Sequence, residues 1–321
     1  MSDTTRPRIL LTRRWPQAVE DRLAARYEVT TNADDVPMDA ASLTTAMCEH
    51  DAICPTVTDR LTAEILECPG LRARIVANYG AGFEHIDLDA ARRVGLVVTN
   101  TPDVLTDATA DIAMMLILMT LRRASEGERE LRDGRWTGWR PTHLLGGGLT
   151  GKTLGLIGYG RIARATAARA AGFGMQIIYH SRNRARDMPD DAYRATPAAL
   201  AADADVVSLH APGGQATRHM VDAAFLAGMR SDAVLVNTAR GSLVDEAALA
   251  AALSAGTIAA AGLDVYADEP RVNPALRACT NAVLLPHLGS ATRETRTAMG
   301  MRLADNLDAV FAGCEPHDRV A

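Results

Sequence analysis

The sequence predicts an α/β protein of two domains, each built around a doubly wound parallel sheet. The chain has 321 residues, about twice the length of an ordinary domain. Short apolar runs alternate with stretches of helical periodicity, which is typical of parallel strands joined by crossover helices. This alternation breaks near residue 100 and restarts near residue 153, so two separate sheets are expected.

The first half contains four apolar runs that we expect to be strands, separated by amphipathic segments that we expect to be helices. The strands are predicted at residues 8–12, 52–54, 73–77 and 96–99, and the helices at 16–27, 40–49, 63–67 and 88–94. Residues 103–123 predict one long, largely apolar helix. Its apolar stretch is too short to cross a bilayer, which favours a helix buried at the seam between the domains.

The second half repeats the strand and helix alternation after a loop that contains tryptophan and glycine. Strands are predicted at residues 153–157, 176–180, 206–210, 233–237, 260–264 and 282–285, and a final helix at 292–311. These six runs are sufficient for a second parallel sheet.

Composition excludes several classes of protein. Hydrophobic residues make up 48% of the chain and the formal net charge is −5, so neither bulk disorder nor a nucleic-acid partner is expected. The amino-terminal residues lack an apolar signal core, and the five cysteines form no C-x-x-C pair. We expect a cytoplasmic protein with reduced thiols and no membrane partner, and no spacing of ligands predicts a metal site.

Two glycine-rich strings compete as phosphate-binding loops. Residues 146–153 match the phosphate-loop template of nucleoside triphosphatases, but a strand pattern follows them where that template requires a helix. The next string places Gly158, Gly160 and Ala163 between an expected strand and an expected helix, as in the dinucleotide-binding turn of Rossmann-like domains. We therefore interpret the second string as the functional one and the first as accidental.

The second strand of this unit ends without the acidic residue that usually binds the ribose of NAD. Ser181 and Arg182 stand there instead. A hydroxyl and a guanidinium suit a 2′-phosphate, which predicts a preference for NADP(H), with NAD(H) as an alternative cofactor. The other interpretation is a solvated loop and an enzyme that uses both cofactors.

Three later segments place reactive side chains after expected strands, where open α/β sheets bind ligands. They contain Arg240 beside Gly241, Asp264 followed by Glu269, and His287 between Pro286 and Gly289. Taken one at a time, each has an ordinary structural explanation, because an arginine pairs with any carboxylate and most histidines are not catalytic.

Together with residues 78–87 and 107–113, these segments and the dinucleotide turn resemble the D-isomer-specific 2-hydroxyacid dehydrogenase family over nearly the whole chain. Residues 286–292 and the tryptophan loop at 136–141 are most similar to its glyoxylate/hydroxypyruvate reductase branch. The resemblance implies a discontinuous substrate-binding domain, residues 1–100 with 286–321, and a dinucleotide-binding domain, residues 101–285, with a cleft between them.

The same resemblance implies the catalytic residues. Arg240 corresponds to the family's substrate-binding arginine, Glu269 to its acid and His287 to its proton donor. A guanidinium suits Arg240 because it binds a carboxylate without losing its charge. An imidazole suits His287 because its unperturbed pKa of ~6.5 is close to working pH.

The remaining site residues follow from the family as well. The implied cofactor contacts are Gly158, Gly160, Arg161, Ile162, Ser181, Arg182, Thr238, Ala239, Asp264, His287 and Gly289. The implied substrate-binding residues are Tyr79, Gly80, Ala81, Gly82 and Arg240.

We therefore expect a homodimeric NAD(P)H-dependent reductase of small 2-oxo acids, such as glyoxylate and hydroxypyruvate, that forms D-2-hydroxy acids. His143 stands where this branch often carries an aromatic residue, so its role is left open. The alternative is a catalytically weak, NAD(P)-sensing binding protein that acts as a corepressor-like scaffold.

Overall fold

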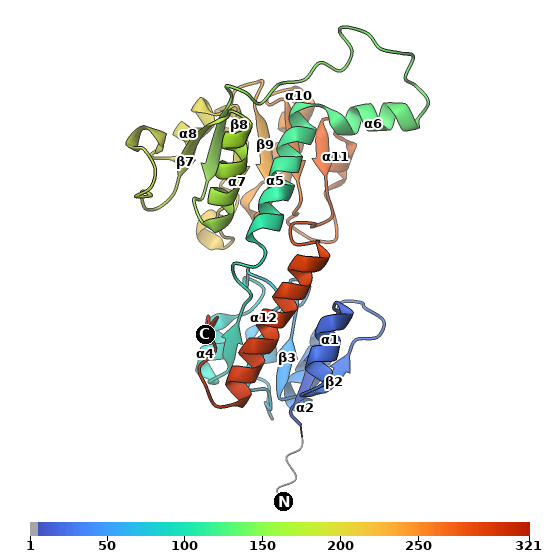
Figure 1. The fold of residues 1–321 in the computed structure, drawn as a ribbon, viewed down its shortest axis with the longest axis vertical. Coiled ribbons are helices and arrows are strands. Elements are labelled where there is room, and N and C mark those ends of the chain that lie inside the picture. The colour runs from blue at the N-terminus through green and yellow to red at the C-terminus, as the bar shows by residue number, and fades with distance from the viewer. Residues whose placement is uncertain (1–5) are drawn as a thin grey trace, which may run out of the picture. The chain divides into compact units, whose positions relative to one another are not determined.

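The computed structural model describes residues 6–321, which divide into two compact units (Figure 1). One unit contains the described residues up to Leu105 together with Ala291–Ala321, and the other contains Thr106–Ser290. The protein is α/β, and both of its sheets are parallel, as the sequence predicts. No helix within residues 6–321 combines the length and apolar character that a membrane crossing needs.

The first unit is a five-stranded sheet in the order β2-β1-β3-β4-β5. Its strands are β1 (Arg8–Leu11), β2 (Glu28–Thr31), β3 (Ala52–Cys54), β4 (Ile75–Ala77) and β5 (Val97–Thr99). Its helices are α1 (Gln17–Ala24), α2 (Ala40–Glu49), α3 (Ala63–Leu66), α4 (Leu88–Arg93) and α12 (Arg293–Phe311). Strand β2 is not among the predicted strands, because it is a largely exposed edge strand without an apolar run.

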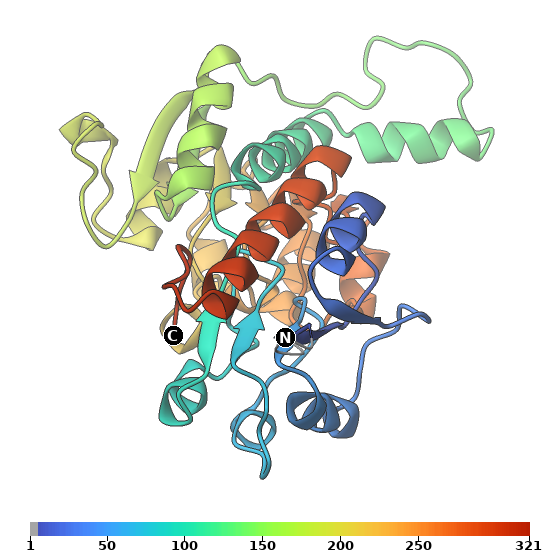
Figure 2. The same ribbon diagram turned by 60° about the horizontal axis from the view of Figure 1, so that its bottom comes forward.

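Helices cover both faces of this sheet. Helices α1 and α12 lie side by side on one face, where Val19 and Leu23 pack with Leu303 and Leu307 (Figure 2). The contact is close, because a Cβ at Gly300 of α12 would lie 2.5 Å from the side chain of Val19. Helices α2, α3 and α4 supply the core of the opposite face.

The second unit is a six-stranded sheet in the order β11-β10-β9-β8-β6-β7. Its strands are β6 (Thr153–Ile157), β7 (Gln176–His180), β8 (Val206–Leu209), β9 (Val234–Asn237), β10 (Ala260–Leu263) and β11 (Ala282–Leu284). Its α-helices are α5 (Thr106–Leu121), α6 (Ala124–Arg132), α7 (Arg161–Gly172), α8 (Pro197–Asp203), α9 (Ala223–Ala227), α10 (Glu246–Ala255) and α11 (Pro274–Ala278). Short 3-10 turns at η1 (Asp190–Ala192), η2 (Gln215–Thr217) and η3 (Gly241–Leu243) complete it.

Helices α5 and α7 pack on one face of this sheet, and α8, α9, α10 and α11 pack on the other. The long apolar helix expected over 103–123 is α5, which is shorter at both ends. Helix α6 was not predicted, because most of its side chains are polar and none of them is buried. It continues into a long loop that extends away from the body of the unit (Figures 1 and 2).

Candidate active site

The second unit carries the glycine-rich turn between β6 and α7. Gly158 has φ +89°, and a Cβ there would lie 2.6 Å from the carbonyl group of His210, so only glycine fits. A Cβ at Gly160 would meet nothing within 4 Å, and Gly160 is the N-cap of α7 without a side-chain cap. The turn thus leaves room for an anion at the start of α7, where no side chain caps the helix, and this fits the pyrophosphate of a dinucleotide.

The competing string at 146–153 does not form a phosphate loop. Lys152 is followed directly by β6, and its ammonium lies 3.3 Å from Oδ1 of Asp205. The Asp205 carboxylate also accepts the N–H of Thr153 (2.8 Å). The lysine thus anchors the start of a strand and is not placed at a helix N-terminus.

The segment after β7 carries two arginines, Arg182 and Arg184, in different surroundings. The guanidinium of Arg184 lies 4.6 Å from the ring centre of Tyr193 and pairs with Asp190 (3.4 Å). Arg182 is exposed, and residues 6–321 offer its side chain no hydrogen bond or ion pair. The hydroxyl of Ser181 donates to the carbonyl of Asn183 (2.5 Å), which leaves its oxygen as an acceptor.

Arg240 follows β9 in a turn held by Asn237. The side-chain amide of Asn237 donates to the carbonyl of Arg240 (2.8 Å), and its oxygen accepts the N–H of Ala239 (3.0 Å). In the same turn the hydroxyl of Thr238 is buried and has no partner within the described chain. A buried hydroxyl without a partner fits a ligand that supplies one.

Gly241 fixes the distance between this turn and the segment that carries Glu269. A Cβ at Gly241 would lie 1.8 Å from the carbonyl carbon of Tyr266, closer than any side chain allows. The N–H of Tyr266 donates to Oε1 of Glu269 (2.9 Å), and the N–H of Ala267 donates to Glu246 (2.7 Å). The arginine turn and the acidic segment are therefore in direct backbone contact.

His287 and Glu269 are hydrogen-bonded. Nδ1 of His287 lies 2.7 Å from Oε2 of Glu269. A carboxylate only accepts, so this bond places the proton on Nδ1 and leaves Nε2 for another partner. Burial raises the pKa of Glu269, but the hydrogen bond and charge of His287, with a smaller contribution from Arg240, lower it more, so its net pKa lies below the usual value.

Asp264 holds the backbone of His287 in place. Its carboxylate accepts the N–H groups of Leu288 (2.6 Å) and Gly289 (2.7 Å), and its own carbonyl accepts the N–H of His287 (2.9 Å). His287 has φ +56°, a left-handed conformation that needs such support. Burial raises the pKa of Asp264 more than these two N–H bonds lower it. The family resemblance implies that Asp264 contacts the cofactor, but both of its carboxylate oxygens already accept backbone N–H groups.

The predicted substrate loop, residues 79–82, lies in the first unit directly after β4. Tyr79 is buried against Trp15, with ring centres 4.5 Å apart, and its hydroxyl donates to the carbonyl of Arg296 (2.5 Å). Burial raises the pKa of Tyr79 to about 12. This tyrosine therefore anchors the loop and stays protonated at neutral pH.

The sequence predicts no role for Val57, which lies beside this loop. Val57 is 42% exposed, and its Cγ1 would lie 3.7 Å from a Cβ at Gly80, so an apolar side chain borders the loop. No sequence motif indicates this contact, because only the fold brings β3 and β4 together.

His143, whose role the sequence leaves open, follows α6 and pairs through Nε2 with Glu130 of that helix (3.2 Å). No cluster of metal-binding side chains occurs in the described part of the chain.

Comparison with known proteins identifies the family. Residues 114–289 match the model of the NAD-binding domain of the D-isomer specific 2-hydroxyacid dehydrogenases. This chain belongs to that family. It is thus an NAD(P)-dependent 2-hydroxyacid dehydrogenase, as the sequence motifs predict.

Relatives and solved structures of the family cover this chain almost end to end. A glyoxylate reductase from Thermococcus litoralis is 42% identical over 98% of this chain and 97% of its own length. A glycerate dehydrogenase from Hyphomicrobium methylovorum is 37% identical over 97% of this chain and 98% of its own. An NADPH-dependent glyoxylate/hydroxypyruvate reductase from Sinorhizobium meliloti, solved with NADP and malonate, is 39% identical with a TM-score of 0.88 over 99% of this chain and 97% of that one.

Proposed function

We propose that this dehydrogenase reduces small 2-oxo acids, glyoxylate and hydroxypyruvate among them, to D-2-hydroxy acids, and that His287 is the proton donor. The hydrogen bond of 2.7 Å between His287 and Glu269 carries the proposal. Relatives about 40% identical that are named glyoxylate reductase support the substrate class.

The chain's own residues divide the work as follows. Arg240 binds the substrate's carboxylate and polarises the ketone through a guanidinium that stays charged. Nε2 of His287 gives a proton to the ketone oxygen, while Glu269 on Nδ1 orients the ring and stabilises its charged form. The nicotinamide, when bound, supplies the hydride. We assign dinucleotide binding to unit 106–290 and a substrate-binding loop, residues 79–82, to the other unit.

Replacing His287 by alanine tests the proton donor. We expect the turnover number for hydroxypyruvate to fall by about 10²–10⁴-fold, while the dissociation constant of NADPH stays unchanged. His317→Ala, at an exposed histidine, is the control and should keep wild-type turnover. A His287→Ala enzyme of normal turnover would remove His287 from proton transfer. A wild-type protein that binds NADPH yet reduces no short 2-oxo acid would favour the binding-protein alternative.

We further propose that NADPH is the preferred cofactor, through Ser181 and Arg182. Arg182 supports this because its side chain is exposed and has no partner within residues 6–321, whereas Arg184 is engaged by Tyr193 and Asp190. Arg182→Ala should lower kcat/KM with NADPH at least ~10-fold and leave kcat/KM with NADH unchanged. Arg184→Ala is the control. Equal efficiency of the wild-type enzyme with both cofactors would contradict the preference.

We also propose a homodimer that uses α6 and the loop after it. This segment exposes Leu131, Trp136, Trp139 and Leu145, with Trp139 82% exposed, although large apolar side chains are normally buried. A second copy would cover them. Sedimentation of Trp139→Ser at dilute concentration should show more monomer than the wild type, and a monomeric wild type would rule the dimer out.

A further inference from the structure

The backbone of the loop at residues 80–82 is oriented by side-chain amides from both ends of the loop. The carbonyl of Gly80 accepts Nδ2 of Asn78 (3.1 Å) and the N–H of Thr101 (2.9 Å). The carbonyl of Gly82 accepts Nδ2 of Asn78 (2.8 Å), and that of Ala81 accepts Nδ2 of Asn100 (2.7 Å). Three successive carbonyl oxygens are thus bound by the chain itself.

The orientation of the Asn78 amide is fixed in turn by His85. Nε2 of His85 lies 3.0 Å from Oδ1 of Asn78, and that oxygen can only accept, so the imidazole is the donor. Asn78 is fully buried and Asn100 is 8% exposed. A buried amide with all of these groups satisfied has one orientation, because turning it over would set its oxygen against two carbonyls.

This arrangement decides where the N–H groups of the loop point. In a trans peptide the C=O and the next N–H lie in one plane and point in opposite directions. The carbonyls of Gly80 and Ala81 are drawn to Asn78 and Asn100, so the N–H groups of Ala81 and Gly82 point away from these amides. Within residues 6–321 neither N–H donates a hydrogen bond. Two adjacent unpaired N–H groups suit the oxygens of a carboxylate.

We propose that Asn78 and Asn100 are positioning residues for substrate binding, with His85 fixing the orientation of Asn78. They touch no substrate; they hold the peptide planes of the loop so that the N–H groups of Ala81 and Gly82 bind the substrate's carboxylate. The proposal rests on the proposed function only in that the carboxylate belongs to a small 2-oxo acid. It assigns the strength of carboxylate binding to two amides that lie outside the loop's predicted contacts.

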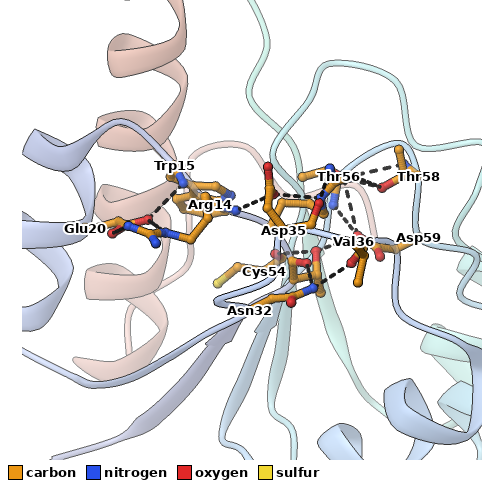
Figure 3. A network of polar contacts seen from close by, with 12 residues as sticks. Arg14, Trp15, Glu20, Asn32, Asp35, Val36, Cys54, Thr56, Thr58 and Asp59 are labelled. Carbon is orange, nitrogen blue, oxygen red and sulfur yellow. Dashed lines mark hydrogen bonds and ion pairs between the residues drawn. The ribbon is translucent and has the colours of Figure 1, made fainter.

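The chain offers a matched control at Asn32. Its side-chain amide also bridges two backbone carbonyls of the same unit, those of Thr12 (2.8 Å) and Val36 (2.6 Å), within a separate polar network (Figure 3). Replacing either asparagine by aspartate keeps the shape and removes the donor. Both variants lose the same kind of bridge, but only Asn78→Asp changes the loop.

The test measures binding of oxalate, an unreactive small dicarboxylate, by calorimetry in the presence of saturating NADPH, together with the KM for hydroxypyruvate. Asn78→Asp should weaken oxalate binding and raise KM about 10–30-fold, with no change in NADPH affinity, and Asn32→Asp should leave all three unchanged. Asn100→Ala should weaken oxalate binding less, because it removes one bond. It also keeps the test valid if Asn78→Asp does not fold, which its melting temperature would show.

The outcomes separate the two proposals. Oxalate affinities that are equal in Asn78→Asp, Asn100→Ala and Asn32→Asp would overturn the positioning role, as would a wild-type enzyme that does not bind oxalate. A wild type that binds oxalate in this Asn78-dependent manner but reduces no 2-oxo acid would support the loop's role and reject the proposed reaction.

Discussion

Gly241 is the position at which one methyl group should disturb the active-site geometry most. The Cβ of an alanine would start 1.8 Å from the carbonyl carbon of Tyr266, whereas real Cβ atoms essentially never come within 3.0 Å of a non-bonded heavy atom of a distant residue. The turn that carries Arg240 and the segment that carries Glu269 must therefore separate by at least 1.2 Å. The atoms that the Cβ would meet all belong to the backbone, so no flexible side chain can absorb this shift.

Two consequences of Gly241→Ala can be measured. Overpacking of this kind costs about 1–3 kcal/mol, which lowers the melting temperature by roughly 3–10 °C. A misplacement of about 1 Å in catalytic groups lowers kcat/KM for hydroxypyruvate about 100-fold. Calorimetry measures the first effect and the oxidation of NADPH at 340 nm the second.

Gly172→Ala is the control, because a Cβ at Gly172 meets nothing within 4 Å and the residue ends α7 with an ordinary backbone conformation. It should be neutral or slightly stabilising. If Gly241→Ala matched the wild type in both melting temperature and kcat/KM, the contact with Tyr266 would not set the position of Glu269.

The remaining predictions concern three charged residues of the site. Arg240→Lys keeps the charge and loses the planar fork, so the KM for the oxo acid should rise at least ~10-fold; unaltered kinetics would place the carboxylate elsewhere. Folding lowers the pKa of Glu269. The carboxylate therefore stabilises the fold fully above pH ~4.3, the pKa of an unfolded glutamate, and this stabilisation is lost as the pH falls through the lower pKa of the folded state. The difference in unfolding free energy between the wild type and Glu269→Gln should therefore shrink as the pH falls from neutral to below ~4, and a constant difference would contradict the ion pair. Asp264→Asn replaces one of the two acceptor oxygens by an NH₂ group that faces an N–H. The free energy of unfolding, measured in urea, should fall by about 1–3 kcal/mol, and turnover should fall because the backbone of His287 loses its support. A fully active, equally stable variant would disprove that support.

The strands of the second unit were predictable because both faces of its parallel sheet are buried. The bounds of β6 and β7 match the predicted runs: four of the five residues of β6 are buried, and β7, although it lies at a sheet edge, keeps an apolar centre at residues 177–179. Strand β2 is also an edge strand, but it has no apolar run and three of its four residues are exposed, so the sequence does not predict it. Helix α6 buries none of its residues, and Ala124 and Leu131 are its only apolar side chains, so no apolar run marks it in the sequence.

The geometry of the candidate site was predictable only in part. The pairing of Glu269 with His287 follows from the family resemblance, and the bond of 2.7 Å is present. The support that Asp264 gives to residues 287–289 depends on a contact across more than twenty residues and on a left-handed backbone at His287, which is rare for a residue other than glycine. The amides of Asn78 and Asn100 likewise act on backbone groups, which sequence patterns do not describe.

The ion pair that joins Lys152 to Asp205 has a practical consequence for studies of assembly. Lys152 is the single lysine of the sequence, and its side chain is only 24% exposed. Amine-directed cross-linkers thus have almost nothing to join between two copies of this chain, and a negative result with them would be uninformative. Reagents that couple carboxylates or arginine side chains would report instead on the abundant surface groups.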